Sequence, residues 1–348
     1  MKRQLRDWAI RSGGVDLLAG RTDRCGEKSW KRVQGGGPIF QTPAGLNFQE
    51  SADWHEWGTL VGMLFHKGAQ RVAFLGQWLM NLLLSLALCF AGDVPETVHF
   101  QSEDHKTKLV AYLFEPSTTG PHAAIVLLHG RMGAYSSAAN GIYTAATLSK
   151  RHRQWGEFWA ARGYLALLVD SFGPRGYPGG FGKGSYEDRP AAVSEQTVRP
   201  LDAYGALRYL RGRNDVIKDR IGVQGWSNGG MTVLVTLSDR SPGIEHPTRG
   251  TGFRAGLAEY PGCGMEAIQG NYHAYAPLLM MIASADEEVS PKRCEEFAVR
   301  NSIENIAYQG AEHNFDDPEK SKQENPADRR AAADAMRRAE AFFAANLQ

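Results

Sequence analysis

The 348-residue chain has almost no excess charge of either sign. Its 39 Lys and Arg nearly balance its 38 Asp and Glu, which gives a formal net charge of +1. Nucleic-acid-binding domains carry a clustered basic excess, so this composition argues against a nucleic-acid partner. The one short basic run, 150–153, therefore indicates a solvated helix face.

Common metal and nucleotide motifs are also missing. No His and Cys residues have the spacing of a zinc site, and no HExxH sequence occurs. Gly182-Lys183-Gly184 lacks the Ser or Thr and the following helix that a phosphate-binding loop requires. Asp316 and Asp317 could bind a metal, but an exposed loop is the simpler interpretation. We therefore expect no metal and no cofactor.

Cysteine is scarce, with four residues in the whole chain. In the last 250 or so residues only Cys263 and Cys294 occur, each after one of two successive predicted strands. Successive elements are usually neighbours, so this pair could form a disulfide. The alternative is two reduced thiols. A disulfide would fit an oxidising compartment.

The first quarter of the chain lacks the pattern of a folded domain. Residues 1–62 contain four tryptophans and many glycines and arginines without a helical or strand period. We expect a non-native or disordered extension there, with Met63 as the true start. Residues 63–91 have a basic start, a charge-free stretch at 72–91 and small residues at the end, which is typical of a secretory signal.

A signal at 63–91 predicts an exported protein, either periplasmic or secreted. Two alternatives remain open. The charge-free stretch at 72–91 is long enough for a transmembrane anchor, which would attach the protein to a membrane. It could also be a buried helix of a longer domain.

Residues 92–348 show the alternation of strands and helices that is typical of one α/β domain. A first pair of strands is expected at 97–102 and 108–115, and further strands near residues 124, 164, 220, 254, 278 and 304. Helices are expected at 154–162, 201–212 and 327–347, and after Ser227 and Pro291. This order predicts a mainly parallel, eight-stranded sheet with helices on both faces.

The most informative motif is Gly225-Trp226-Ser227-Asn228-Gly229, a G-x-S-x-G sequence that follows the apolar run 220–224. At a sharp turn from strand to helix, a serine in this motif projects its hydroxyl above the sheet edge. The glycines allow close packing and strained dihedral angles. The first amide of the following helix points to the same place and can stabilise a negative oxygen. The motif therefore predicts that Ser227 is a nucleophile.

An acid and a histidine follow Ser227 in the chain order that a serine triad on this kind of sheet requires. Asp286 comes after the apolar strand 278–283, and His313 comes after the strand 305–308. Glu287 is an alternative acid one residue further on, and Glu259 is a more distant one. A second oxyanion amide should come from the loop 129–133, in which we expect His129 to support the loop.

These segments resemble the dienelactone hydrolase family of α/β-hydrolases. The resemblance covers roughly residues 95–346 and rests on four segments: 129–133, 169–176, 222–230 and 286–294. It implies the α/β-hydrolase fold and hydrolysis of small-molecule esters or lactones. By motif position Ser227 is the nucleophile, Asp286 the acid and His313 the base, and the amides of Arg131 and Asn228 form the oxyanion hole.

The chain departs from the members that cleave dienelactone in two positions. Those members use a cysteine nucleophile where this chain has Ser227, and they carry a glutamate where it has Gly130. Dienelactone itself is therefore not the expected substrate. A peptidase or acyltransferase on the same fold, and a non-catalytic binding protein, remain alternatives.

The segment 171–185 holds six glycines and two prolines and follows a predicted strand. Loops at that end of the sheet face the ligand crevice in α/β folds. Phe172, Tyr177 and Phe181 are therefore candidates for the apolar walls of a substrate site. The alternative is a plain surface loop.

Overall fold

The computed structural model describes residues 94–319 and 321–348. The extension expected at 1–62 and the signal or anchor expected at 63–91 lie outside these residues. No helix within the described part of the chain is both long and apolar enough to cross a membrane.

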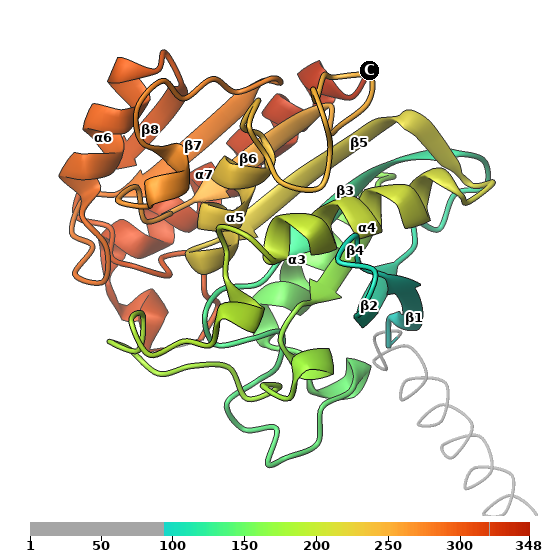
Figure 1. Ribbon diagram of the computed structural model, residues 1–348. Coiled ribbons are helices and arrows are strands. Elements are labelled where there is room, and N and C mark those ends of the chain that lie inside the picture. Colours follow the sequence, from blue (N-terminus) through green and yellow to red (C-terminus); the bar gives the residue numbers. More distant parts are fainter. Residues whose placement is uncertain (1–93, 320) are drawn as a thin grey trace, which may run out of the picture. The chain divides into compact units, whose positions relative to one another are not determined.

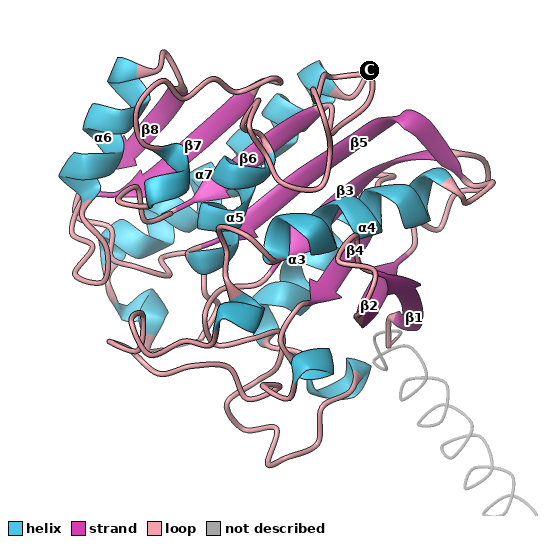
Figure 2. Cartoon of the chain, in the orientation of Figure 1, coloured by secondary structure: helices cyan, strands magenta, loops and turns pink. Residues whose placement is uncertain are grey.

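The described residues form one eight-stranded sheet, as predicted, in the order β1-β2-β4-β3-β5-β6-β7-β8. β2 is antiparallel to β1 and to β4, and the remaining neighbours are parallel. Figure 2 shows this sheet between layers of helices. The strands are β1 Glu96–Gln101, β2 Lys108–Phe114, β3 His122–Leu128, β4 Leu165–Asp170, β5 Val216–Trp226, β6 Ala255–Glu259, β7 Leu278–Ala283 and β8 Glu304–Tyr308.

Within the described residues, five α-helices cover the two faces of the sheet, as can be followed in Figure 1. Their buried side chains separate into two apolar clusters: Tyr204, Val233 and Phe297 of α4, α5 and α6 belong to one, and Trp155 and Phe343 of α3 and α7 belong to the other. The predicted two-sided packing is therefore confirmed. The helices are α3 Lys150–Ala160, α4 Arg199–Arg211, α5 Asn228–Thr236, α6 Pro291–Arg300 and α7 Pro326–Asn346.

The central strands explain why the sheet needs both layers. In β3, Val126 and Leu128 point into the first cluster, whereas Ile125 and Leu127 point into the second. This alternation is the two-residue period of a strand, and apolar residues on both faces leave neither face suited to water. Parallel strands all end at one edge of the sheet, so the loops after β3, β5, β7 and β8 meet there.

The expectation of a solvated basic face at 150–153 is wrong for two of its residues. Arg151 and His152 are only 8% and 3% exposed. Arg151 forms ion pairs with Asp316 and Asp317, and Asp316 is itself buried rather than part of an exposed loop. The first turn of α3 thus packs onto the loop that follows His313.

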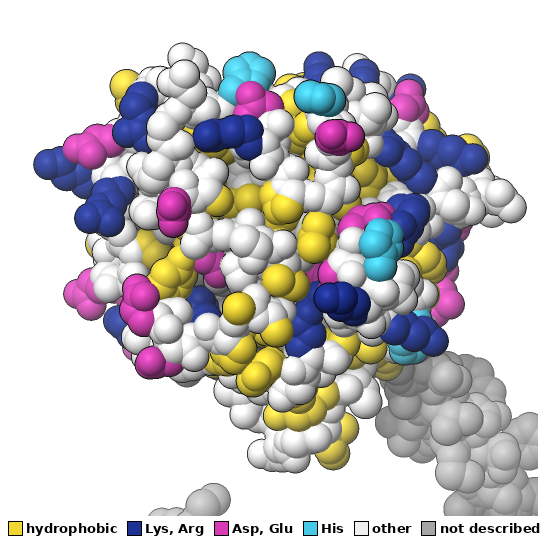
Figure 3. Space-filling view, viewed as in Figure 1, with side chains coloured by type: hydrophobic (Ala, Val, Ile, Leu, Met, Phe, Trp, Pro, Cys, Tyr) yellow, Lys and Arg dark blue, Asp and Glu magenta, His cyan; other side chains and the backbone are white. Residues whose placement is uncertain are grey.

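Charge elsewhere is dispersed. On the face that Figure 3 presents, Lys and Arg side chains lie among Asp and Glu rather than in one basic patch. This distribution agrees with the near-zero net charge of the chain and gives that face no footprint for a polyanion.

Candidate active site

Ser227 lies at the turn between β5 and α5 with a backbone conformation that side chains rarely adopt, at φ 52° and ψ −113°. The glycines of the motif make this turn possible. A Cβ at Gly225 would lie 2.4 Å from the Gly229 carbonyl oxygen, and a Cβ at Gly229 would lie 1.9 Å from the Leu128 carbonyl oxygen. Only glycine permits this close approach of strand and helix, which leaves the serine hydroxyl at the end of the sheet.

The imidazole of His313 lies between Ser227 and Asp286. Its Nε2 is 2.9 Å from Ser227 Oγ, and its Nδ1 is 2.6 Å from Asp286 Oδ2. A carboxylate can only accept at Nδ1, so Nδ1 carries the hydrogen and Nε2 is left to accept from the serine hydroxyl. Ser227 and His313 are 8% and 5% exposed, so this hydrogen-bonded chain is largely protected from water.

Of the three acids that the sequence left open, Asp286 is the one that contacts His313. Its second oxygen, Oδ1, accepts hydrogen bonds from the backbone N–H groups of Glu288 and Val289 at 2.8 and 3.0 Å, which orient the carboxylate. Glu287 is exposed. Glu259 is fully buried beneath the site, where it accepts a hydrogen bond from Gln224 at 2.6 Å.

The loop after β3 packs directly against Ser227. A Cβ at Gly130 would lie 3.6 Å from the Cβ of Ser227, and Arg131 lines both cavities that reach the serine. Asn228 is the first residue of α5, where backbone N–H groups have no partner within the helix. The two residues assigned to the oxyanion hole thus lie on either side of the hydroxyl.

His129 supports this loop from inside the protein. Its Nδ1–H donates to the Gly130 carbonyl at 2.7 Å, and its Nε2 accepts from the Ser171 backbone N–H at 3.2 Å. Complete burial, together with the charge of Arg199, lowers the pKa of His129 well below its usual value. The ring therefore stays neutral, as an accepting Nε2 requires.

Arg199 joins the two oxyanion segments. It donates to the His129 carbonyl at 2.8 Å and to the side-chain oxygen of Asn228. The Asn228 amide in turn donates to Glu195 at 2.9 Å. Burial lowers the pKa of Arg199 to about 10, so it remains charged at neutral pH. Arg199 and Glu195 were not predicted from the sequence, because no local spacing marks a residue that acts across the fold.

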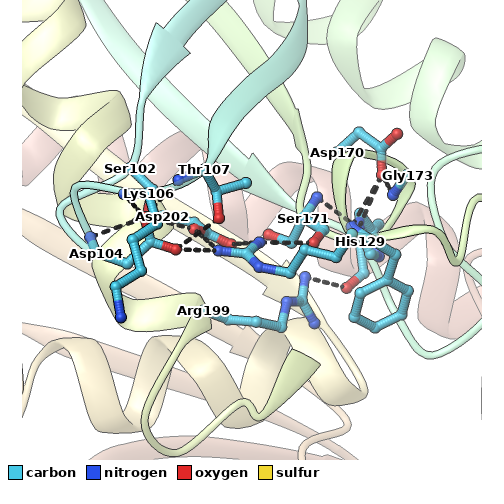
Figure 4. A network of polar contacts seen from close by, with 12 residues as sticks. Ser102, Asp104, Lys106, Thr107, His129, Asp170, Ser171, Gly173, Arg199 and Asp202 are labelled. Carbon is cyan, nitrogen blue, oxygen red and sulfur yellow. Dashed lines mark hydrogen bonds and ion pairs between the residues drawn. The ribbon is translucent and has the colours of Figure 1, made fainter. Parts of the chain in front are cut away.

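A second buried network fixes the start of the loop 171–185 (Figure 4). Arg175 donates to both oxygens of the fully buried Asp202 at 2.8 Å, to Asp104 at 2.9 Å and to the Ser171 carbonyl at 2.8 Å. Asp170 accepts from the backbone N–H groups of residues 172 and 173 at 3.0 and 2.8 Å. The loop is thereby tied to β4 and α4.

The predicted apolar wall of Phe172, Tyr177 and Phe181 is not found. Phe172 is fully buried, with its ring edge-on to His129 at 4.5 Å. Phe181 packs against Phe172 and Tyr177 at 5.2 and 5.3 Å, and none of the three lines a cavity at Ser227. The three rings pack on one another and on His129 instead, and the Phe181 N–H, which donates to the Arg131 carbonyl at 2.8 Å, ties this part of the loop to the neighbouring one.

Two cavities meet at Ser227. The larger has a volume of 540 Å³ and the smaller 160 Å³. Among the residues lining the larger cavity are the charged side chains Arg131, Lys183, Glu187, Arg189, Glu287, Glu288 and Arg293. The smaller one is bordered by Met132, Tyr135, Lys150 and His313. A molecule bound at Ser227 thus has space on two sides of the hydroxyl.

Cys263 and Cys294 form a disulfide, with their Cα atoms 5.1 Å apart. It connects the loop after β6 to α6, and Cys263 lines the larger cavity. The bond therefore stiffens one wall of the site.

Glu288, the second residue after Asp286, is a further site residue that was not predicted from the sequence. Glu288 accepts two hydrogen bonds from Arg131, both at 3.0 Å, and lies 3.8 Å from His313 Nε2. Its position within a run of acids in the sequence was the available signal, but the partner is 157 residues away.

Comparisons with known proteins identify the family of this chain. The model of the dienelactone hydrolase family matches residues 109–347. A Bradyrhizobium sp. protein named as a 2-oxo-3-(5-oxofuran-2-ylidene)propanoate lactonase is 28% identical over 225 residues, which are 59% of this chain and 78% of that protein. The Bacillus subtilis (strain 168) protein YtaP, named as a hydrolase, is 26% identical over 164 residues, 42% of this chain and 50% of that protein.

Among solved structures, a crystal structure named as a dienelactone hydrolase from Klebsiella pneumoniae subsp. pneumoniae MGH 78578 superposes with a TM-score of 0.50. Its sequence identity is 17%, and the match covers 72% of this chain and 99% of that one. At this identity the likeness concerns the fold.

Proposed function

We propose, since this chain belongs to the dienelactone hydrolase family and is a carboxylic ester hydrolase, that it cleaves its substrate through an acyl-enzyme on Ser227. His313 acts as the general base and Asp286 orients it. The observation that supports this proposal is the buried hydrogen-bonded chain from Ser227 Oγ to His313 (2.9 Å) and on to Asp286 (2.6 Å).

The reaction follows from the protonation states of these groups. Ser227 Oγ attacks the ester carbonyl while its proton passes to His313 Nε2. Asp286 stabilises the resulting imidazolium through Nδ1–H. The backbone N–H groups of Arg131 and Asn228 donate to the oxyanion, and such donors are each worth roughly 3–4 kcal/mol of barrier. Nε2–H then protonates the leaving alcohol, and water releases the acyl group by the same steps.

The larger cavity favours a substrate that carries a negative charge. Lys183, Arg189 and Arg293 line it without an ion-pair partner among the described residues. The exposed acids Glu187 and Glu287 also line the cavity, so its basic side chains only slightly outnumber its acidic ones. The Bradyrhizobium relative is named for a lactone with a propanoate group. We therefore propose an ester or lactone with a carboxylate near the scissile bond.

This preference is tested with matched substrates. The hemisuccinate and butyrate esters of p-nitrophenol differ mainly in one carboxylate, and the hemisuccinate should have the higher kcat/KM. Replacing both Arg189 and Arg293 by Gln should remove the difference. Equal values for the two esters in the wild type would exclude a charged subsite.

The triad itself is tested with Ser227→Ala. We expect ester hydrolysis to fall to the background rate with an unchanged circular dichroism spectrum, and a fluorophosphonate probe to label Ser227 in the wild type but not in the variant. Residual activity near the wild-type level would place the nucleophile elsewhere. An absence of labelling would favour a non-catalytic binding protein, and a parallel panel of esters, lactones and peptide amides separates an esterase from a peptidase.

We also propose that the protein is exported, with residues 63–91 as a signal or, alternatively, as a membrane anchor. The disulfide between Cys263 and Cys294 supports an oxidising compartment. Cell fractionation and N-terminal sequencing of the mature protein test this proposal. A cytosolic protein that retains residues 63–91 would contradict both forms of it.

A further inference from the structure

The side chains of Arg131 and Glu288 form a two-pronged ion pair across the active site. Arg131 Nε and one terminal nitrogen each donate to a Glu288 carboxylate oxygen at 3.0 Å. The two side chains are 14% and 18% exposed. Such paired, planar hydrogen bonds are stronger and more directional than an ordinary surface ion pair. Arg131 comes from the loop after β3 and Glu288 from the loop after β7, so the pair joins two loops that β5 and β6 separate in the sheet.

Glu288 also faces the catalytic imidazole from the side that Asp286 does not occupy. Its Oε2 lies 3.8 Å from His313 Nε2, the nitrogen that bonds Ser227. The other groups around His313 are Asp286 at Nδ1 and the ring of Tyr260 at 4.9 Å, whose hydroxyl donates to Asp316.

The carboxylate of Glu288 is surrounded by positive groups. Burial opposes its ionisation, but the hydrogen bonds and charge of Arg131, with smaller effects from His313 and Lys183, hold its pKa below the usual value. Arg189 is a further cation near it. Glu288 is therefore ionised throughout the pH range in which a histidine titrates.

We propose that Glu288 is a positioning residue of this reaction: it holds Arg131, and with it an oxyanion-hole amide, and its charge stabilises the imidazolium of His313. This inference rests on the proposed function, because it assigns a role within the same triad. The proton taken from Ser227 resides on Nε2, which is the nitrogen nearest Glu288. A negative charge at that distance favours the charged ring. The positive charge of Arg131 offsets part of this effect, so Glu288 stabilises the imidazolium less than Asp286 does.

The test is the pH dependence of kcat/KM in Glu288→Gln. Glutamine has the same shape and keeps one acceptor oxygen, but it carries no charge. A nearby negative charge favours the charged form of the ring, so the acid limb of the profile should lie at lower pH in the variant than in the wild type. We expect kcat to fall about tenfold through looser placement of the oxyanion loop, with a smaller change in KM.

Glu287→Gln is the matched control for the position of the limb, because it removes an exposed neighbouring carboxylate that has no hydrogen bond or ion pair with a triad member. Glu287 also lines the larger cavity, so the comparison concerns the pH of the limb and not the height of the profile. Its acid limb should coincide with that of the wild type. Glu288→Asp keeps the charge on a shorter side chain and should restore the wild-type limb while kcat remains low. If Glu288 had only a structural role, Glu288→Gln and Glu288→Asp would have the same acid limb.

The contact with Arg131 is tested by a double-mutant cycle with Arg131→Met and Glu288→Gln. If the pair acts as a unit, the double variant should lose no more kcat than the worse single variant. Losses that multiply, or an unshifted acid limb in Glu288→Gln, would overturn the inference. Fluorophosphonate labelling of Ser227 in each variant shows that the triad is intact, so these results would refute the role of Glu288 alone. Full activity of Ser227→Ala would instead refute the proposed function.

Discussion

Replacing Asp286 by Asn separates the orientation of His313 from the packing of the site. Asp286 accepts hydrogen bonds from the backbone N–H groups of Glu288 and Val289, and the side-chain oxygen of asparagine can accept both equally well. The side-chain amide group must then face His313 Nδ1, 2.6 Å from the present carboxylate oxygen. That amide can only donate, so Nδ1 becomes the acceptor and the ring hydrogen moves to Nε2.

A ring protonated at Nε2 presents a hydrogen to Ser227 Oγ where a lone pair is required. The corresponding change in serine proteases lowers kcat by about 10⁴-fold with the geometry intact. We expect a loss of about 10³–10⁴-fold here, which corresponds to roughly 4–5.5 kcal/mol of transition-state stabilisation. The folded state should lose little stability, because every backbone hydrogen bond of the acid loop is kept.

The measurement is kcat for a p-nitrophenyl ester at pH 8, with the melting temperature of each variant as the control for folding. Glu287→Gln and Asp286→Asn change the two adjacent acids among the three that the sequence left open. A loss of less than tenfold in Asp286→Asn, with a larger one in Glu287→Gln, would show that the wrong carboxylate has been assigned.

Three further predictions concern stability. Gly229→Ala should cost at least about 2 kcal/mol and abolish activity, since the added Cβ would lie 1.9 Å from a backbone oxygen; a fully active, equally stable variant in urea denaturation would contradict the close approach. Replacing Cys263 and Cys294 together by Ser should cost about 3–4 kcal/mol for a separation of 31 residues, and reductant should then destabilise the wild type but not the variant. Burial and the nearby Asp316 raise the pKa of Glu259 in the folded protein well above 4.5. As pH rises above 4.5, Glu259 therefore loses its proton in the unfolded chain before it does so in the folded one, and the free energy of unfolding decreases. Glu259→Gln should therefore stabilise the fold, and its advantage should grow between about pH 5 and pH 8; an advantage that shrinks over that range would show that Glu259 is ionised in the folded protein.

The sheet could be predicted because its strands are short, apolar and separated by turn-forming residues. The run 278–283 is entirely apolar and is buried throughout β7. The one extensive underestimate is β5, where the apolar run 220–224 marks only the centre of a strand that covers 216–226. Its first half has only two apolar residues, at 216 and 217, which are followed by Lys218, Asp219 and Arg220, so no continuous hydrophobic pattern marks it.

Ser227, Asp286 and His313 could be located because each follows its own strand, and parallel strands bring their ends to one edge. The prediction that Phe172 and Phe181 form a wall of the substrate site failed for a physical reason. An aromatic ring in a glycine-rich loop can face the ligand or anchor the loop, and both choices bury apolar surface. Here the rings anchor the loop, through the contacts of Phe172 with His129 and of Phe181 with Phe172, and sequence spacing does not contain these contacts.

The supporting charges follow a different logic from the core. Burying an ion pair seldom adds stability over an apolar pair of the same size, so Arg175 with Asp202 is poor evidence for a stable fold. Breaking such a pair is costly, however, because it leaves an unpaired buried charge. The loops 129–133 and 171–176 are not held by the hydrogen bonds that join neighbouring strands. An oxyanion amide must nevertheless be held to within about 0.5 Å. Buried charged groups that hydrogen-bond across both loops, such as Arg199 to His129 and Asn228, penalise displaced arrangements of these loops and so supply the rigidity that the catalytic amides need.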